Sequence, residues 1–312
     1  MFDRVTQGDE LSEEGKLNSA PLLDRLKLEP TARGASFRGL PPQGFRGRLF
    51  GGHLLGQAVL AAGRTVDAGR PANSIQAYFV APGVPGVPIT YEVETLREGE
   101  SFSLRALRAV QEERLLLTAN ASFVAERQPE VPLSAPMPDV PAPEDLPSLH
   151  ERRTQQPELW DGIRWPTRRD WETASRPMDI RYIDALEEPG PPRRCFWFRM
   201  APASGADANA RRAMLAFASD RSLLPAVTVA RGEQGSAPPP KVASVDHAMW
   251  FHGDAPPGSW CLYVQESPVS TAALGLARGL IYSRGGQVVA SVAQQGVFSR
   301  GARAAERPEP MK

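Results

Sequence analysis

Apolar residues recur at helical spacing in one segment of the first half of the chain and at strand spacing in the segments after it. Residues 51–66 (GGHLLGQAVLAAGRTV) are rich in alanine and leucine and predict a helix. Four runs follow, separated by glycine, proline or charged turn residues: SIQAYFVAPG, ITYEVETLREG, SFSLRALRAVQEE and RLLLTANASFV. Their composition and spacing predict four strands after the helix.

The second half repeats this order of elements. Residues 207–231 predict a second helix, which the Asp207 side chain can cap. Four further strand-like runs follow it: KVASVDHAMWFHG, SWCLYVQESP, LGLARGLIYSRGG and QVVASVAQQGVF. The glycine pair at 285–286 predicts a hairpin between the last two.

Aligning the halves suggests a duplicated unit of one helix and a run of antiparallel strands. The separation between matched residues of the two halves rises slowly along the chain, as short loop insertions in the second half would cause. The matched pairs, 168, 170 and 175 residues apart, are Gly52 with Asp220, Ser74 with Ser244, and Phe123 with Phe298. A helix with one apolar stripe needs a sheet to cover it, so we expect an α+β fold in which antiparallel sheets cover helices.

A proline-rich segment divides the chain. Seven prolines fall between Pro129 and Pro147, and proline can extend neither a helix nor a central strand. We therefore expect a first domain over 21–126, a semi-stiff linker over 127–150 and a second domain over 151–300. Residues 1–20 and 301–312 are expected to be mobile.

Composition narrows the class of protein. The 36 basic and 36 acidic side chains give zero net charge, which argues against general nucleic-acid binding. Residues 159–176 mix tryptophans with arginines, and a structural element and a nucleic-acid contact are both open for them. No apolar run is long enough to span a membrane, and no signal peptide is evident. The two cysteines, Cys195 and Cys261, lie in apolar runs and are expected to be free and buried, which indicates a reduced cytoplasmic protein.

Seven ordered blocks resemble the acyl-CoA thioesterase II family. They are FRGRLFGGHLLGQAVLAA, QAYFVAPG, REGESFSLR, RPMDIRY, FASDRSLLP, SVDHAMWFH and ASVAQQG. The resemblance runs from about residue 22 to residue 300, nearly the whole chain. The resemblance implies a double hotdog fold, in which two antiparallel sheets, each wrapped around a long helix, join into one sheet within a single chain. It also implies hydrolysis of acyl-CoA to free acid and coenzyme A, with no metal, cofactor or covalent intermediate. The implied catalytic residues are Asp220, Ser244 and Gln294.

The residues themselves give these three positions unequal weight. Asp220 lies in the apolar stretch MLAFASDRSLLPAV, where a buried carboxylate is costly unless it is hydrogen-bonded. Pro225 interrupts the helix nearby, so an alternative is that Ser219 or Asp220 caps a helix restarting there. A strand serine or glutamine alone is uninformative, because such residues usually face solvent or pair across the sheet. The assignment of Ser244 and Gln294 to the site therefore depends on the order of the seven blocks.

Thioester hydrolysis suits this set of side chains. A carboxylate can orient and deprotonate water, while a hydroxyl and a carboxamide can hold the same water in line. The oxyanion donor stays unassigned, with a backbone amide near a helix terminus as the generic candidate. The first half has Gly52 and about Ala119 opposite Asp220 and Gln294, so we expect it to complete the acyl pocket and the sheet without a second site.

Other functions fit the same residues less well. Hydration of an enoyl thioester would require an Asp–His pair in one site, and the adjacent Asp246 and His247 cannot face each other on one strand. His247 and His252 lie five apart, on opposite faces of a strand, and do not form a metal pair. The motif G-x-S-x-G is absent, which argues against a serine hydrolase. A non-catalytic acyl-CoA binder on the same fold stays open, and Arg278 could contact a coenzyme A phosphate or only solvent. We expect a homodimer or a higher homo-oligomer.

The sequence departs from the family mainly in its first half. His53 stands where family members often have glutamine, and Asn73 and Gln76 stand where they often have histidine. These differences bear on pocket shape and acyl preference more than on the proposed site.

Overall fold

The computed structural model describes most of both predicted domains. The described residues are 22–40, 49–125, 134–148, 151–152, 155, 178–183, 192–203, 205–233, 241–256 and 258–299. The segments 1–20 and 301–312, predicted to be mobile, and the tryptophan- and arginine-rich tract 159–176 lie outside them.

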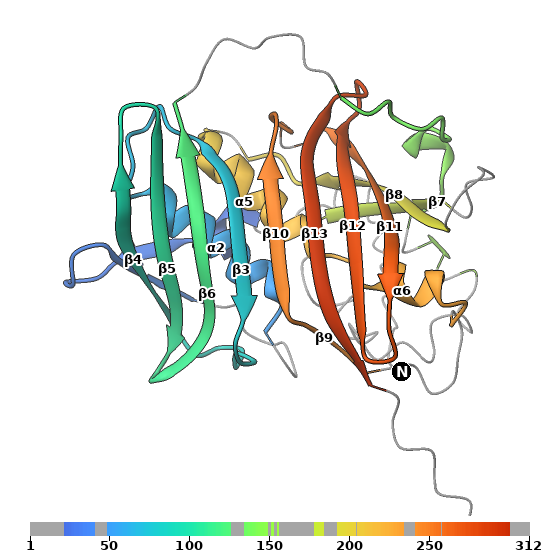
Figure 1. Ribbon diagram of the computed structural model, residues 1–312. Helices are drawn as coiled ribbons and strands as arrows, with labels where there is room; N and C mark the ends of the chain where they lie inside the picture. Colours follow the sequence, from blue (N-terminus) through green and yellow to red (C-terminus); the bar gives the residue numbers. More distant parts are fainter. Residues whose placement is uncertain are drawn as a thin grey trace, which may run out of the picture.

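The described strands form one antiparallel sheet (Figure 1). Along it the order is β1-β2-β4-β5-β6-β3-β10-β13-β12-β11-β8-β7, and β9 pairs with β13. The bounds in the first half are β1 (Leu28–Pro30), β2 (Ser36–Gly39), β3 (Ala72–Phe79), β4 (Ile89–Glu98), β5 (Phe102–Gln111) and β6 (Arg114–Val124). Those in the second half are β7 (Met178–Ile183), β8 (Arg193–Met200), β9 (Lys241–Ser244), β10 (Asp246–Phe251), β11 (Trp260–Ser270), β12 (Leu274–Ser283) and β13 (Val288–Ser299).

The two halves of the sheet mirror each other. The order β4-β5-β6-β3 meets β10-β13-β12-β11, so each half places its strands in the same sequence from edge to centre. The halves join where β3 and β10 pair, with Ala77 opposite His247 and Ile75 opposite Met249. This arrangement confirms the double hotdog fold expected from the sequence, in a single chain.

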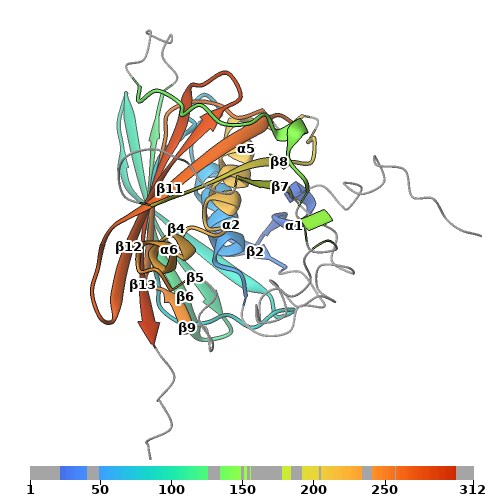
Figure 2. The same cartoon turned by 90° about the vertical axis from the view of Figure 1, so that its right-hand side faces the viewer.

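The helices lie on the concave face of the curved sheet (Figure 2). They are α1 (Leu22–Arg25), α2 (Gly51–Gly63), α5 (Ala208–Ser219) and α6 (Pro225–Ala230). The 3₁₀ turn η2 (Pro143–Asp145) belongs to the proline-rich segment, which packs on the other face. The long helices α2 and α5 pack against each other and supply much of the core, including Leu55, Val59, Met214 and Leu215, each fully buried. Burial of such side chains is the main force that holds the two halves together.

Glycine allows α2 and α5 to approach closely. A Cβ added to Gly52 would collide with the carbonyl oxygen of Phe217, and one added to Gly56 would lie 3.0 Å from the carbonyl oxygen of Ala213. Gly52 therefore faces the last turn of α5 and Gly56 an earlier one, so the helices run antiparallel. The N-terminus of α2 meets the C-terminus of α5.

The second predicted helix is broken at Asp220. Helix α5 begins at its cap Asp207, whose carboxylate accepts from the Ala210 amide at 2.7 Å, as the sequence predicted. It ends at Ser219, and α6 begins at Pro225. Between them Ser222 adopts a φ of 63°, a backbone conformation that costs energy for a non-glycine residue. The alternative that Ser219 or Asp220 caps α6 is wrong, since α6 starts after Leu224 with no side-chain cap.

The described part of the proline-rich segment lies against the second half of the sheet. Met137, Val140 and Leu146 pack on a cluster that includes Trp197 and Tyr282. The Trp197 indole donates to the Pro141 carbonyl at 2.9 Å, and the Tyr282 hydroxyl donates to that of Pro136 at 3.3 Å. Residues 134–148 are thus held along this face, and the domain boundaries on either side stay a prediction.

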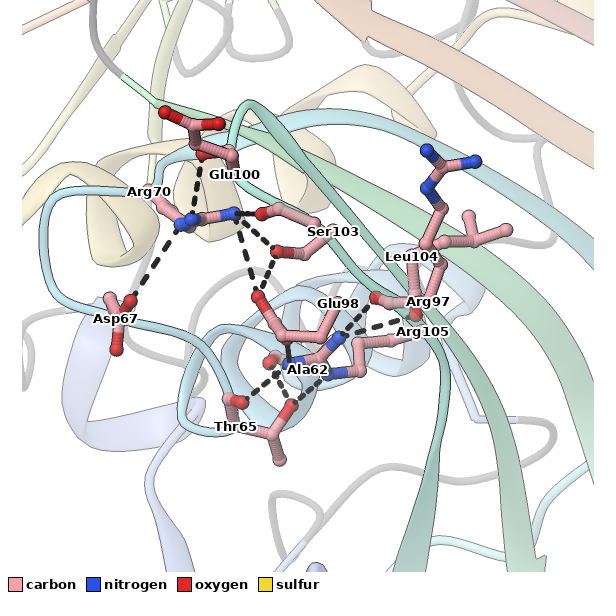
Figure 3. Close-up of polar contacts among 11 residues, drawn as sticks. Ala62, Thr65, Asp67, Arg70, Arg97, Glu98, Glu100, Ser103, Leu104 and Arg105 are labelled. Atoms are coloured by element: carbon pink, nitrogen blue, oxygen red, sulfur yellow. Dashed lines mark hydrogen bonds and ion pairs between the residues drawn. The ribbon is translucent and has the colours of Figure 1, made fainter.

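A polar cluster ties the end of α2 to the β4–β5 hairpin (Figure 3). The Arg105 guanidinium, 2% exposed, donates to Thr65 Oγ1 at 2.9 Å, to the Thr65 carbonyl at 2.8 Å and to the Arg97 carbonyl at 3.0 Å. It also pairs with Glu98, which Arg70 approaches to 3.5 Å. Every partner of Arg105 is a carbonyl, hydroxyl or carboxylate of the protein itself, so this cluster is structural.

Both cysteines are free and buried, as predicted. Burial raises the pKa of the Cys261 thiol to about 12, so it stays protonated at physiological pH. In the part of the chain that the structure describes, no helix is both long enough and apolar enough to cross a membrane.

Candidate active site

Asp220 lies where the two long helices meet. It follows the last residue of α5, and its Oδ2 accepts a hydrogen bond from the Gly52 amide of α2 at 2.8 Å. Helix α2 has no cap from its own preceding residue, Phe50. A carboxylate from the other half of the chain therefore satisfies one of the free amides at the start of α2. Its side chain is 7% exposed.

Gln294 connects the three residues predicted from the sequence. Its Nε2 donates to Asp220 Oδ1 at 2.7 Å and to Ser244 Oγ at 2.9 Å. The carboxylate comes from the end of α5, the amide from β13 and the hydroxyl from the end of β9. Residues separated by up to 74 positions in the sequence thus form one hydrogen-bonded group.

An irregularity between β9 and β10 places Ser244 beside Gln294. Strand β13 pairs Ala293 with Ala248 of β10 but Gly296 with Ser244 of β9, so one extra residue lies on the β9–β10 side. That residue is Val245, whose amide donates to the Gln295 carbonyl at 2.9 Å and whose carbonyl accepts from Phe79. A bulge of this kind changes which face the preceding side chain occupies. Ser244 can thereby reach the inner face that Gln294 occupies.

Burial raises the pKa of Asp220 from 3.8 to about 6. Desolvation is the main cause, and the hydrogen bonds from Gln294 and Gly52 and the charge of Arg221 oppose it. A carboxylate with a pKa near neutrality accepts a proton more readily than an exposed aspartate does, and it is still ionised at pH 7 to 8. These are the properties of a general base.

Sequence reasoning missed His247. Its ring, from β10, is 1% exposed, and Nε2 lies 2.9 Å from Ser219 Oγ while Nδ1 lies 3.9 Å from Asp220 Oδ1. The expectation that no Asp–His pair shares a site was therefore wrong. That expectation compared His247 only with its neighbours along the strand, whereas Asp220 reaches it from the helix packed beneath. Burial lowers the pKa of His247 to about 3, so the ring is neutral at physiological pH.

The first half takes a more direct part in the site than expected. Gly52, the position matched to Asp220, supplies the amide that Asp220 binds. Ser74, the position matched to Ser244, is instead bonded to Ser122 Oγ at 2.7 Å. The first half thus contributes the backbone amide of Gly52 to the site in the second half, and it also extends the sheet.

Comparison with known proteins identifies the family to which the chain belongs. A family model described as the acyl-CoA thioesterase N-terminal domain matches residues 41–124, and one described as the acyl-CoA thioesterase C-terminal domain matches residues 143–298. The chain belongs to the acyl-CoA thioesterase II family. It is therefore an enzyme of the thioester hydrolase class.

Named members of the family align along most of the chain. Acyl-coenzyme A thioesterase 8 of Mus musculus is 34% identical over 263 residues, covering 80% of each chain. Acyl-CoA thioesterase 2 of Haemophilus influenzae is 32% identical, covering 82% of this chain and 88% of its own. A solved acyl-CoA thioesterase II from Mycobacterium marinum superposes with a TM-score of 0.73 at 29% identity, covering 92% of this chain and 99% of its own.

Proposed function

We propose that this enzyme hydrolyses acyl-CoA thioesters to a free carboxylic acid and coenzyme A, using a water positioned by Asp220, Ser244 and Gln294. The observation that carries the proposal is the Gln294 amide, which contacts the carboxylate and the hydroxyl at once. A water bound to the same two oxygens would lie beside a base. The named activities of the relatives supply the substrate class.

In the reacting complex, Asp220 accepts a proton from the water as its oxygen bonds to the thioester carbonyl carbon. Collapse of the tetrahedral intermediate breaks the carbon–sulfur bond, and the departing thiolate takes up the proton that Asp220 accepted, which returns Asp220 to its ionised form. Ser244 can accept or donate and so can hold the water in line. Because Gln294 is fixed by both neighbours, it sets the distance between base and hydroxyl and thus the direction of attack.

The N-terminus of α2 is the candidate oxyanion site. Its first residue, Gly51, adjoins the carboxylate, since a Cβ added there would lie 2.8 Å from Asp220 Oδ2. Helix N-termini present free amides with a partial positive charge, which suits a developing oxyanion. The Gly52 amide is already bonded to Asp220, so the Gly51 amide is the one we assign to the substrate.

Two other functions are less well supported. Enoyl hydration needs a histidine that touches the substrate, but both ring nitrogens of His247 face protein groups, Ser219 on one side and Asp220 on the other. A non-catalytic binder would have no need of a buried carboxylate with a raised pKa. The Arg278 guanidinium, considered for a coenzyme A phosphate, pairs with Glu266 and is 61% exposed, so that contact stays a prediction.

Thiol release from a series of acyl-CoAs tests the proposal. We expect the wild type to release thiol and the variants Ser244→Ala and Gln294→Ala to lose roughly tenfold or more in kcat. Gln295→Ala is the matched control, because that side chain follows Gln294 on the same strand and faces the other side. Binding of acyl-CoA without thiol release would instead indicate a carrier. Wild-type rates in Ser244→Ala and Gln294→Ala would refute this site.

Assembly and location complete the proposal. We propose that the enzyme works in a reduced, cytoplasmic compartment, since both cysteines are free. We also propose that it forms a homo-oligomer. Fractionation of the producing cells would test the first point, and sedimentation of the purified enzyme the second.

A further inference from the structure

His247 is a buried polar group that the hydrolytic step does not use. Its Nδ1 has no hydrogen-bond partner among the described residues, and neither does Gln294 Oε1. Both side chains are 1% exposed. A buried polar atom without a partner costs about 1–3 kcal/mol, so two such atoms side by side call for an explanation.

The two side chains are neighbours across the sheet. The pairing of β10 with β13 ends at Ala248 and Ala293. Continuing the same register by one residue, ahead of the bulge at Val245, places His247 opposite Gln294. Directly opposite residues on one face have Cβ atoms about 5 Å apart. The Gln294 carboxamide also opposes the lowering of the His247 pKa by burial, which indicates that the two groups interact.

The hydrogen atoms available decide how these groups are arranged. Gln294 directs its two amide hydrogens at Asp220 and Ser244, so its oxygen needs a donor. If Ser219 gives its only hydrogen to the Ala216 carbonyl, His247 must donate through Nε2, and Nδ1 becomes a bare acceptor facing another acceptor. If Ser219 donates to Nε2 instead, Nδ1 carries the hydrogen and provides the missing donor.

We propose that His247, as the neutral Nδ1–H tautomer, donates to Gln294 Oε1 and thereby fixes the carboxamide with its NH₂ group toward Asp220 and Ser244. His247 is thus a positioning residue for the attacking water, and this role rests on the proposed function. Without it the amide could turn over when Asp220 is protonated, since a protonated carboxyl can donate to the amide oxygen. The water would then lose the group that aligns it.

The surroundings keep the ring neutral. The groups that face it are Asp220 and Ser219 from α5, Gln294 from β13 and the Tyr263 hydroxyl of β11, which donates to the Ser219 carbonyl at 3.0 Å. Arg221 follows on the chain and acts on Asp220. With the pKa of His247 near 3, only Asp220 among these titrates between pH 5 and 8.

Nitrogen NMR of the wild-type enzyme tests the tautomer directly. With ¹⁵N-labelled histidine, the His247 resonances are assigned by their absence from His247→Leu. We expect hydrogen on Nδ1 and none on Nε2 at pH 6 to 8. Hydrogen on Nε2 alone would overturn the proposal, and this result does not depend on which reaction the enzyme catalyses.

Kinetics of three variants test the positioning role. The Asn amide reaches the place of Nδ1, whereas the Gln amide reaches that of Nε2. We expect His247→Leu and His247→Gln to lose about tenfold in kcat with KM little changed, and His247→Asn to recover part of that loss. Equal rates for His247→Asn and His247→Gln would contradict the proposal, because a merely structural role makes no such distinction.

A double-variant cycle separates this proposal from the proposed function. In a Gln294→Ala background, His247→Leu should have no further effect on kcat, since His247 acts through Gln294. Additive losses would overturn the positioning role. A wild-type rate for Gln294→Ala alone would refute the catalytic site, while the tautomer would still stand or fall by NMR. His252→Leu, at an exposed ring bonded to Ser291 at 2.8 Å, is the control that should keep its kcat.

Discussion

At the scale of single residues, the dipoles of α5 and α2 act in opposite directions on the charge of Asp220. It follows the C-terminus of α5, where a negative charge is unfavourable, and it binds the N-terminus of α2, where a negative charge is favourable. Removal from water adds the largest effect and raises the pKa to about 6. The side chain is thus charged at the working pH but holds a proton more tightly than an exposed aspartate.

The pH dependence of the rate follows from this pKa. Because the base must be ionised to accept a proton, kcat/KM should rise with pH through about 6 and level off above it. Measurement from pH 4.5 to 8.5 with one acyl-CoA checks this. A rate that stays flat from pH 5 to 8 would exclude Asp220 as the titrating base.

The raised pKa of Asp220 also predicts that its ionised form lowers the free energy of unfolding. Between pH 3.8 and about 6 the unfolded chain releases the Asp220 proton before the folded one does, so the free energy of unfolding falls as pH rises. Asp220→Asn removes that charge and should be more stable than the wild type by up to roughly 3 kcal/mol above pH 6. The difference should vanish near pH 4. Urea unfolding at both pH values measures it, and a less stable variant at pH 8 would contradict the account.

The sequence singles out Asp220 as unusual more clearly than it does the neighbouring candidates Ser244 and Gln294. A carboxylate inside an apolar helical stretch is anomalous on its own, whereas a serine and a glutamine on strands are not. His247 could not be found by the same reasoning, because its partner Asp220 lies on another element. The alternation of side chains along a strand carries no information about what packs beneath it.

At the scale of elements, the crossing of α2 and α5 builds the site. The close approach at Gly52 brings one helix's free amide to the other helix's final carboxylate. The bulge at Val245 then turns Ser244 toward Gln294. The two long helices and most strands could be predicted from periodicity, but the bulge could not, since it shows only in the pairing of β13 with β9 and β10.

Gly52→Ala tests the helix crossing. The new methyl group would collide with the Phe217 carbonyl, separate the helices and weaken the amide bond to Asp220. Since that bond lowers the pKa of Asp220, the midpoint of the pH–rate profile should move upward, and the rate at pH 7 should fall roughly tenfold.

The matched control is Gly56→Ala, one turn further along α2. Its Cβ would lie 3.0 Å from the Ala213 carbonyl and would also strain the helix contact. It should lower the melting temperature but leave the midpoint of the profile in place. Equal shifts in both variants would show that the Gly52 amide has no special effect.

At the scale of the whole molecule, the two halves share one architecture but contribute different groups. Both have a helix and the same strand order, and this symmetry was visible in the sequence as a rising offset. The second half holds the three polar side chains of the site, while the first half has the Arg105 cluster at the far end of α2. The 13 residues of α2 separate the two by about 18 Å.

Arg105→Met should separate stability from activity. Loss of the guanidinium leaves the Thr65 and Arg97 carbonyls without this donor, so the free energy of unfolding should fall by roughly 2 kcal/mol or more. The folded variant should keep its kcat. Arg108→Met, at an exposed position of the same strand, is the control for stability. A selective loss of kcat in folded Arg105→Met would show that the cluster contributes to the reaction.

Thiol release at pH 8 by the wild type and by Asp220→Asn tests whether Asp220 activates the water. Asparagine keeps the size of the side chain and an oxygen for the Gly52 amide but cannot accept the proton of water. We predict a folded variant that binds acyl-CoA and loses roughly a hundredfold or more in kcat. A folded variant that hydrolyses acyl-CoA at the wild-type rate would show that Asp220 does not activate the water.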